Sequence, residues 1–349
     1  MDRVIRVLVV DDSAYVRKVV KQMLSRSPFI EVVGTARDGA EGLEMVKDLN
    51  PDVITCDLMM PGMDGIAFLT AQMARKFVPV VIVSIANESG ELALAALDAG
   101  AIDFVQKPTA LATEKIFEVS DELIEKVKAA ATASMSHLHI APPGASVEPL
   151  PGSRIEPRAG LIDMIVLGIS TGGPQALKYM VPQLPEDLPA PLVVVLHMPV
   201  GYTEMYARKL DSISKITVRE AREGNRVEPG VMLLAPAGRH LTFRREANGT
   251  VVTHLDTRPF DTPHRPSVDV LFQSAAETFR DRTLGVVMTG MGSDGKQGAA
   301  WIKSQGGLIF TEAEETCVIF GMPSSVIEAG LSDRIVPLDR MAQAIMEVV

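Results

Sequence analysis

Three side chains in the second half of the sequence could together carry out nucleophilic catalysis. They are Ser170, His197 and Asp294, and each follows closely on an apolar run rich in Val, Leu and Ile. A hydroxyl, an imidazole and a carboxylate are the nucleophile, the general base and the orienting group of a serine hydrolase. The apolar runs are typical of buried parallel strands, whose carboxyl ends meet at one edge of a sheet. We therefore expect the three side chains to lie together and to hydrolyse an ester or an amide.

The turn that contains the serine has a pattern of its own. Residues 168–172 read Gly-Ile-Ser-Thr-Gly, which fits the G-x-S-x-G pattern of a strand–turn–helix nucleophile elbow. Donors at such a helix start stabilise an oxyanion, and the backbone at Thr171 and Met291 is the candidate here. Two other interpretations stay open: the serine only caps the following helix, or the glycine-rich turn holds a phosphate. The chain order Ser…His…Asp also differs from the Ser…Asp…His order of α/β-hydrolases.

His197 and Asp294 have structural interpretations as well. A histidine beside an apolar strand is often a satisfied core residue, and Asp294 could simply cap the helix predicted over residues 297–305. However, His197 ends the strand that follows the Ser170 turn, where a general base is needed. Three further residues are candidates for substrate binding or for purely structural roles: His240, His264 and Arg265.

The first third of the chain carries a second set of polar strand ends. Asp11 and Asp12 end the first predicted strand and Asp57 the third, while Ser84 and Lys107 end the fourth and the fifth. Three carboxylates at one edge repel each other, so a divalent cation is their natural partner, and Mg²⁺ suits a site with few protein oxygens. A hydroxyl and a lysine nearby could bind a phosphoryl group. The alternative is a set of exposed polar strand ends, which accounts less well for five such residues in this order.

Strands and helices alternate along most of the chain, which predicts a doubly wound α/β fold with mostly parallel sheets. We expect an N-terminal α/β domain over residues 1–133, a Pro-rich linker over 134–160 and a C-terminal α/β domain over 161–349. The C-terminal domain also contains a β-rich section that predicts a β-hairpin excursion. The linker contains His137 and His139, for which solvated positions are favoured over a metal site.

Composition is typical of soluble globular protein. Of the 349 residues, 47% are hydrophobic and 22% charged, and no apolar run reaches the roughly 18 residues that cross a bilayer. The first residues lead into a strand without signal-peptide architecture, so we expect a cytoplasmic protein without membrane insertion. The net charge of −10 argues against nucleic acid as a partner. Cys56 and Cys317 lie in or beside apolar segments and are expected to be buried free thiols.

The N-terminal segment resembles a response-regulator receiver domain, which has a flavodoxin-like fold. The resemblance implies that Asp57 accepts a phosphoryl group from a chemotaxis histidine kinase. It also implies that Mg²⁺ is held by Asp12, Asp57 and the carbonyl of Met59, with Asp11 acting mainly through water. The motifs that carry the resemblance are the acidic pair Asp11-Asp12, the loop 57–65, the switch positions Ser84 and Phe104, and the pair Lys107-Pro108.

The C-terminal segment resembles the catalytic domain of the chemotaxis protein-glutamate methylesterases of the CheB type. The triad positions match, and Ser293 stands where the family often has an Asn. The resemblance implies that Ser170 attacks methyl-glutamate side chains of methyl-accepting chemotaxis receptors, with deamidation of glutamine as a second activity. It implies no cofactor in this domain. The motifs that carry the resemblance are residues 168–173, 197–199, 264–269, 289–295 and 320–323.

The two resemblances together cover nearly the whole chain and predict a phosphorylation-activated hydrolase that serves adaptation in chemotaxis. We expect the unphosphorylated receiver to keep a bulky receptor helix away from Ser170, and phosphorylation of Asp57 to release the site. The rival hypothesis is a phosphorylation-controlled nucleotide-binding or interaction module without hydrolase activity. Against the rival, His197 stands where a ribose-binding acid is expected.

Overall fold

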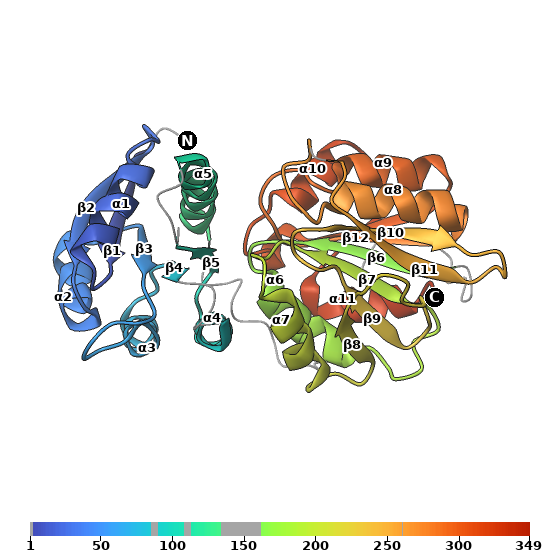
Figure 1. Cartoon of the computed structure of the whole chain (residues 1–349), viewed down its shortest axis with the longest axis horizontal. Coiled ribbons are helices and arrows are strands. Elements are labelled where there is room, and N and C mark those ends of the chain that lie inside the picture. Colours follow the sequence, from blue (N-terminus) through green and yellow to red (C-terminus); the bar gives the residue numbers. More distant parts are fainter. Residues whose placement is uncertain (1–2, 85–89, 108–112, 134–161, 260) are drawn as a thin grey trace. The chain divides into compact units, whose positions relative to one another are not determined.

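The chain consists of two compact units, and each is described by itself. The computed structural model describes residues 3–84, 90–107, 113–133, 162–259 and 261–349. The units are Met1–Met135 and Ser136–Val349, and Figure 1 draws the first from blue to teal and the second from green to red. The predicted linker 134–160, with His137 and His139, lies outside the described residues, and the predicted domain bounds stay predictions.

The first unit is a parallel sheet with helices packed on it. Its described strands are β1 (Ile5–Val10), β2 (Ile30–Ala36), β3 (Val53–Cys56), β4 (Val80–Ser84) and β5 (Asp103–Gln106). Its described helices are α1 (Ala14–Leu24), α2 (Gly39–Leu49), α3 (Gly65–Arg75), α4 (Gly90–Asp98) and α5 (Thr113–Ala130). The strand order is β2-β1-β3-β4-β5, and every pairing is parallel. The strands are rich in Val and Ile because they are buried; in β4 every residue is buried.

The loops that follow β1 and β3 each end at a helix that is capped by a side chain. Ser13 and Asp64 stand at the N-caps of α1 and α3, and each accepts a hydrogen bond from a backbone N–H in the first turn. Ser13 comes directly after Asp11 and Asp12, and Asp64 closes the loop that begins at Asp57. The strand order reverses between β1 and β3, and ligands of open α/β sheets bind at such a point.

The second unit contains seven described parallel strands and an antiparallel hairpin. The strands of the main sheet are β6 (Met164–Ile169), β7 (Leu192–Leu196), β8 (Thr217–Glu220), β9 (Val231–Leu234), β12 (Thr283–Val287), β13 (Leu308–Glu312) and β14 (Arg334–Val336). The hairpin is β10 (His240–Arg245) and β11 (Val251–Asp256). The described helices are α6 (Gly173–Met180), η2 (Val181–Gln183), α7 (Thr203–Asp211), α8 (Val268–Phe279), η3 (Arg280–Arg282), α9 (Lys296–Ser304), η4 (Glu314–Thr316), α10 (Met322–Glu328) and α11 (Leu338–Met346).

The main sheet has its own reversal of strand order. Its order is β14-β13-β12-β6-β7-β9-β8, so the chain runs outward from β6 on one side and returns through β12 on the other. In Figure 1, α8, α9 and α10 lie on one face of this sheet, and α6, α7 and α11 lie on the other. Ser170, His197 and Asp294 follow β6, β7 and β12, which are neighbours at the reversal. The predicted doubly wound, mostly parallel α/β class is confirmed, and so is the hairpin excursion.

Helix α8 covers the strands that lead to this reversal. Its buried residues recur at helical spacing, as at Val268, Leu271, Phe272 and Ala275, so one face of the helix is apolar. A Cβ added at Gly168 of β6 would overlap Val268, which shows how closely helix and strand approach. Each large apolar side chain buried here contributes about 1.5–3 kcal/mol to stability. The first turn of α8 is therefore held next to the turn that contains the serine.

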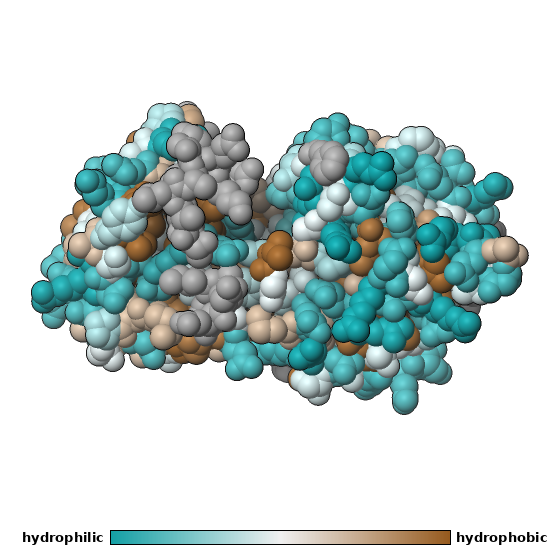
Figure 2. Space-filling model, viewed as in Figure 1, coloured by the Kyte–Doolittle hydropathy of each residue, from teal (hydrophilic) through white to brown (hydrophobic). Residues whose placement is uncertain are grey.

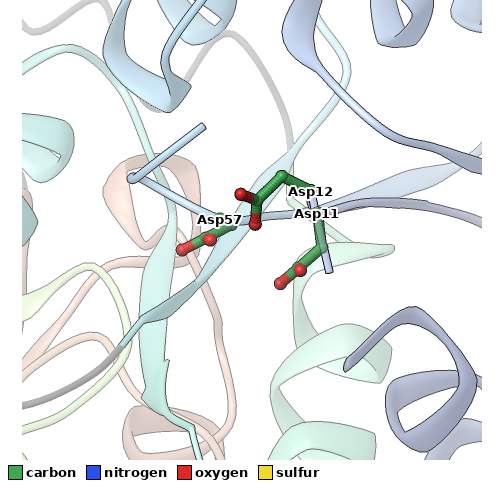
Figure 3. Close-up of side chains that lie close together, drawn as sticks. All are labelled: Asp11, Asp12 and Asp57. Atoms are coloured by element: carbon green, nitrogen blue, oxygen red, sulfur yellow. The ribbon is translucent and has the colours of Figure 1, made fainter. Parts of the chain in front are cut away.

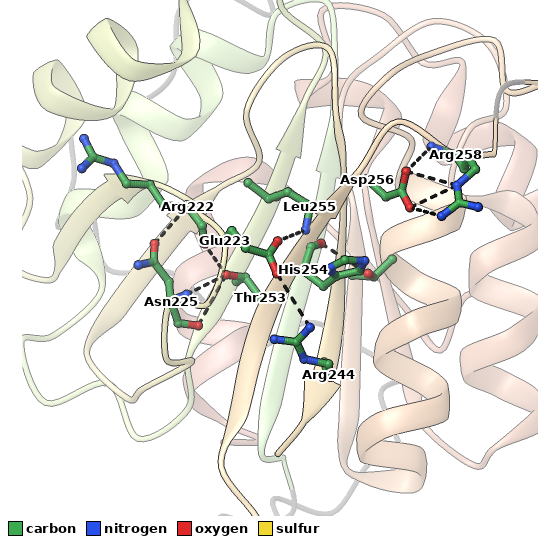
Figure 4. A network of polar contacts seen from close by, with 10 residues as sticks. Arg222, Glu223, Asn225, Arg244, Thr253, His254, Leu255, Asp256 and Arg258 are labelled. Carbon is green, nitrogen blue, oxygen red and sulfur yellow. Dashed lines mark hydrogen bonds and ion pairs between the residues drawn. The ribbon is translucent and has the colours of Figure 1, made fainter. Parts of the chain in front are cut away.

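The hairpin is tied to the loop that follows β8, as Figure 4 shows. Thr253 donates from Oγ1 to the carbonyl of Arg222 at 2.6 Å, and Glu223 accepts from the backbone N–H of Leu255 at 2.7 Å. The carboxylate of Glu223 also lies 3.1 Å from Nδ1 of His254. These contacts fix β11, and with it the paired strand β10, beside the main sheet.

The face of the molecule drawn in Figure 2 is mainly hydrophilic, with apolar residues in small scattered groups. The most exposed large apolar side chains of the described residues are Val200, at 64%, and Met59, at 60%. Across the described ranges, no helix is both long enough and apolar enough to cross a membrane. Cys56 and Cys317 are buried free thiols, as the sequence predicts.

Candidate active site and phosphoacceptor site

His197 and Asp294 form the central contact of the candidate active site. Nε2 of His197 lies 2.9 Å from Oδ2 of Asp294, and both side chains are largely buried, at 10% and 7% exposure. Because the carboxylate accepts, the neutral imidazole carries its proton on Nε2. Its Nδ1 is buried and has no hydrogen-bond partner among the described residues. The nitrogen left to take a proton is therefore Nδ1.

The carboxylate of Asp294 is held by four donors. Oδ2 accepts from His197 and from the N–H of Val268 at 2.8 Å, while Oδ1 accepts from Ser267 Oγ and from the N–H of Asp269, each at 2.9 Å. The two amides belong to the first turn of α8, where N–H groups lack partners within the helix and favour negative charge. Burial disfavours the carboxylate, but the contacts with His197 and with the amides outweigh burial and lower the pKa of Asp294 to about 2. Asp294 is thus a fixed anion that can orient His197 and stabilise its protonated form.

The structure corrects one interpretation of Asp294. The residue does not cap the helix that it precedes, because α9 begins after Gly295 without a side-chain cap, and Asp294 binds the amides of α8 instead. In exchange, Asp269 of α8 accepts from the N–H groups of Gly295 and Gly298 at the start of α9. The two helices pack together and cap one another.

Ser170 stands in the turn between β6 and α6 and is partly exposed. Its N–H donates to the carbonyl of Thr289 at 2.9 Å. Helix α6 begins after Gly172, whose φ of 81° lies in the left-handed region, and no side chain caps it. The interpretation of Ser170 as only a helix cap is therefore wrong. No hydrogen bond joins Ser170 Oγ to His197 in the part of the chain that the structure describes, and such bonds are often long before substrate binds.

The loop after β12 passes directly against the serine. A Cβ added at Gly290 would lie 2.8 Å from Cβ of Ser170 and would overlap Met322, so glycine is required there. The carbonyl of Gly290 accepts from the N–H of Met322 at 2.8 Å, which holds the loop in place. Met291 follows directly, and Thr171 follows Ser170. The two candidate oxyanion segments therefore flank the serine.

His264 lies over the candidate base. The rings of His264 and His197 stack with centroids 4.1 Å apart and an interplanar angle of 25°. His264 is exposed and its neighbour Arg265 is half-buried. His264 is therefore placed where a substrate that reaches His197 would meet it.

His240 has a structural position instead. It is fully buried, its Nδ1 accepts from the N–H of Ser267 at 3.2 Å, and its Nε2 lies 3.1 Å from the carbonyl of Pro259. Burial lowers the pKa of His240, which favours the neutral ring that these contacts require. His240 thus supports Ser267, which in turn donates to Asp294.

Three carboxylates lie close together at the ends of β1 and β3 (Figure 3). One oxygen from each of Asp11, Asp12 and Asp57 lies within 4.8 Å of the other two. Asp11 and Asp57 are buried and Asp12 is exposed, and burial raises the pKa of Asp11. A cation would offset the cost of three charges at this spacing, and carboxylate oxygens are the ligands that Mg²⁺ prefers. The residues therefore fit the predicted metal.

Lys107 bridges two of these carboxylates. Its Nζ lies 2.7 Å from Oδ2 of Asp11 and 2.7 Å from Oδ2 of Asp57. Burial disfavours the ammonium group, but these two contacts outweigh burial and raise the pKa of Lys107. The other oxygen of Asp57 accepts from the N–H of Leu58 at 2.8 Å. The lysine places positive charge beside the carboxylate that is expected to receive a phosphoryl group.

The remaining predicted receiver residues lie nearby. Ser84 ends β4 and is buried, and its carbonyl accepts from the N–H of Lys107 at 2.7 Å. Phe104, within β5, is buried in the core of the unit. Met59 follows Asp57 by two residues, and its side chain is exposed. The edge of the sheet thus collects the acidic residues, Ser84 and Lys107.

Known proteins match both units. Residues 7–118 match the response regulator receiver domain, and residues 165–345 match the CheB methylesterase family. A protein of Myxococcus xanthus named protein-glutamate methylesterase/protein-glutamine glutaminase 5 is 49% identical over 338 residues, which are 97% of this chain and 96% of that protein. The chain belongs to the CheB methylesterase family.

Further CheB relatives match over similar lengths. A Thermotoga maritima protein, named protein-glutamate methylesterase/protein-glutamine glutaminase, is 41% identical and covers 100% of this chain and 99% of its own. The crystal structure of the Thermotoga maritima CheB methylesterase catalytic domain matches with 44% identity and a TM-score of 0.53, over 54% of this chain and 99% of that one. A receiver domain followed by a CheB catalytic domain is therefore the architecture of this chain.

Sequence reasoning did not predict the contacts by which several residues support the CheB site. Ser267 and Asp269 hold Asp294 and the start of α9, and no local pattern signals an exchange of caps between two helices. Glu312, at the end of β13, is fully buried and accepts from the N–H of Thr289 at 2.8 Å. A carboxyl group at the end of an otherwise apolar strand is the signal that could have found it.

Proposed function

We propose that this chain is a phosphorylation-activated protein-glutamate methylesterase of chemotaxis, with Ser170, His197 and Asp294 as its catalytic residues. The observation that carries the proposal is the 2.9 Å contact between His197 Nε2 and Asp294 Oδ2, at the strand-order reversal that also holds Ser170. The relatives that align with nearly the whole chain carry the names protein-glutamate methylesterase and protein-glutamine glutaminase.

In the first half of the reaction, Ser170 Oγ attacks the γ-carbonyl carbon of a methyl-glutamate side chain. The hydroxyl proton passes to Nδ1 of His197, and Asp294 stabilises the imidazolium that forms. The backbone N–H groups of Thr171 and Met291 stabilise the negative oxygen. As the bond to the methoxy group breaks, the imidazolium returns the proton to that group. Methanol leaves, and an ester joins Ser170 to the glutamyl side chain.

In the second half, water attacks the carbonyl carbon of this ester. His197 takes a proton from the water, the bond to Ser170 Oγ breaks, and Oγ regains a proton from the imidazolium. The product is a glutamate side chain. The same steps on a glutamine side chain release ammonia, which is the deamidation that the glutaminase name describes. His264 and Arg265 would contact the receptor segment that carries the reacting side chain.

Control of this reaction would lie in the receiver unit. An oxygen of Asp57 attacks the phosphorus of a phosphohistidine on a chemotaxis histidine kinase, and the bond from phosphorus to that histidine breaks. Mg²⁺ held by Asp12, Asp57 and the carbonyl of Met59, with Asp11 acting through water, would neutralise charge on the phosphoryl group. The 2.7 Å contact between Lys107 and Asp57 supports a role for the lysine in binding that group. The substrates would be methyl-accepting chemotaxis receptors.

A serine-reactive fluorophosphonate distinguishes a hydrolase from a binding module. We expect the reagent to label wild type at Ser170, identified by mass spectrometry of the modified peptide, and to leave Ser170→Ala unlabelled. His197→Gln should be labelled much more slowly because the base is missing. Ser212→Ala, at an exposed serine that ends α7, is the matched control and should be labelled like wild type. Wild type that resists the reagent would contradict the proposal.

A further inference from the structure

A buried carboxyl group beneath the candidate active site takes no part in the steps above. Glu312 is 0% exposed. Its Oε2 accepts from the backbone N–H of Thr289 at 2.8 Å, and its Oε1 accepts from Oγ1 of Thr316 at 3.0 Å. A carboxyl group is costly to bury unless it is well bonded, so the groups that it binds are held firmly in place.

Thr289 connects Glu312 to the turn of the nucleophile. Its carbonyl accepts from the N–H of Ser170 at 2.9 Å, and its Oγ1 donates to the carbonyl of Thr171 at 2.9 Å. The same hydroxyl accepts from the N–H of Ile319 at 3.0 Å. Thr289 thus binds the two peptide groups on either side of the Ser170–Thr171 peptide, and Glu312 binds the N–H of Thr289.

These contacts decide where the candidate oxyanion donors point. The N–H of Thr171 lies between the two peptide groups that Thr289 binds, so its direction depends on them. On the other side, the N–H of Gly290 donates to the carbonyl of Ile319 at 3.0 Å, and Met291 follows. If Glu312 lost its acceptor oxygens, the buried N–H of Thr289 would be unpaired and the loop would move to find a partner. Both donors would then shift relative to Ser170.

We infer that Glu312 is a positioning residue of the hydrolytic site, which acts through Thr289 to hold the turn of Ser170 and the loop of Met291 in the geometry that binds the oxyanion. The inference rests on the proposed hydrolase function. Glu312 touches no substrate, and its effect passes through hydrogen bonds of the backbone.

The groups around Glu312 can form hydrogen bonds with a neutral side chain as well as with a carboxylate. Thr316 Oγ1 accepts from the N–H of Leu338 at 3.0 Å and lies 3.3 Å from the carbonyl of Ala313. Its hydroxyl can therefore donate to Glu312, or donate to Ala313 and accept from a protonated Glu312. A glutamine side chain fits the same contacts, with its oxygen on Thr289 and its NH₂ on Thr316. Glu312→Gln is thus a conservative variant, and Glu312→Leu removes every polar contact.

The test measures methanol release from methylated receptor by the full chain with saturating phosphodonor and Mg²⁺. Glu312→Leu should lower kcat about tenfold or more with KM nearly unchanged, because a misplaced donor weakens binding of the oxyanion. Glu312→Gln should keep kcat within about threefold of wild type, because the acceptor for Thr289 remains. Thr289→Val should behave like Glu312→Leu. Thr283→Val is the matched control: it removes an equally buried hydroxyl at the other end of β12 and should lower Tm while leaving kcat unchanged.

The outcomes distinguish a positioning role of Glu312 from a purely structural role. If Glu312→Leu lowers Tm as much as Thr283→Val does but keeps kcat, the inference is overturned. If Glu312→Leu does not fold, Tm and kcat of Thr289→Val are compared with those of Thr283→Val instead. A Thr289→Val that loses Tm but keeps kcat would then overturn the inference. Glu312→Gln must have a kcat near that of wild type, unlike Glu312→Leu. The fluorophosphonate should label Ser170 in Glu312→Leu more slowly than in Thr283→Val. A wild type without methanol release, or an active Ser170→Ala, would instead overturn the proposed function itself.

Discussion

Replacing Asp294 by asparagine should nearly abolish hydrolysis, because asparagine cannot serve all four donors that bind the aspartate. The oxygen of an asparagine can accept from one pair only, either His197 with Val268, or Ser267 with Asp269. The NH₂ group must face the other pair. If it faces His197, the ring has to present an acceptor there and carry its proton on Nδ1, so the base is lost. In either arrangement one N–H of the first turn of α8, that of Val268 or that of Asp269, has no acceptor, and the imidazolium loses the negative charge beside it.

The expected losses in kcat and in Tm follow from these two arrangements of the asparagine side chain. A wrong tautomer in a triad costs roughly 10⁴ in kcat. An unpaired buried amide costs about 1–3 kcal/mol of folding free energy, and a domain of this size loses roughly 2–4 °C of Tm for each kcal/mol. We therefore expect Asp294→Asn to lose up to about four orders of magnitude in kcat together with several degrees of Tm.

The matched control is Asp269→Asn. Asp269 caps the partner helix through Gly295 and Gly298 and makes no contact with His197 in the described structure. Both amides share Oδ1 of Asp269, so the oxygen of an asparagine can accept from both; this variant should lose less stability than Asp294→Asn and keep kcat within about threefold. Methanol release from methylated receptor gives kcat, and thermal unfolding gives Tm. If Asp294→Asn kept a tenth or more of the wild-type kcat, or if Asp269→Asn lost as much as Asp294→Asn, the assignment of Asp294 would be refuted.

Four other predictions concern control and stability. Asp57→Asn should abolish stimulation of methanol release by a small phosphodonor and leave the basal rate, and equal stimulation of variant and wild type would contradict this. Chelation of Mg²⁺ should remove the same stimulation from wild type, and readdition should restore it. Burial raises the pKa of Glu312 from 4.5 to about 7, so the folded state holds its proton more tightly than the unfolded state does. The contribution of Glu312 to the free energy of unfolding should therefore fall by up to about 3 kcal/mol as the pH rises from 4.5 to 7. Urea titrations of wild type should contain this pH-dependent contribution, and those of Glu312→Gln should not. The isolated segment 155–349 should release methanol faster than the intact unphosphorylated chain, and a rate no higher would count against repression by the receiver.

Much of the candidate site follows from one rule about parallel sheets. Apolar runs locate the strands, and residues just beyond their ends must meet at one edge, so Ser170, His197 and Asp294 could be grouped without coordinates. The same rule groups Asp11, Asp12 and Asp57. It succeeds because both the strands and the polar residues at their ends are local features of the sequence.

The partners of these residues could not be predicted in the same way. The amides that hold Asp294 come from α8, more than twenty residues earlier, and they meet it only because α8 and α9 pack together. The sequence likewise cannot show that Nε2 rather than Nδ1 of His197 faces Asp294, since ring orientation depends on tertiary packing. The edge strands β8 and β14 could not be predicted either, because their sequences, Thr-Val-Arg-Glu and Arg-Ile-Val, contain no apolar run.

The role of Ser170 is tested most directly by methanol release from methylated receptor by wild type and Ser170→Ala, each with and without a small phosphodonor and Mg²⁺. Wild type should release methanol, faster with the phosphodonor, and Ser170→Ala should release none under either condition. Release by Ser170→Ala at the wild-type rate would contradict Ser170 as the nucleophile, since the hydrolysis would then belong to another residue.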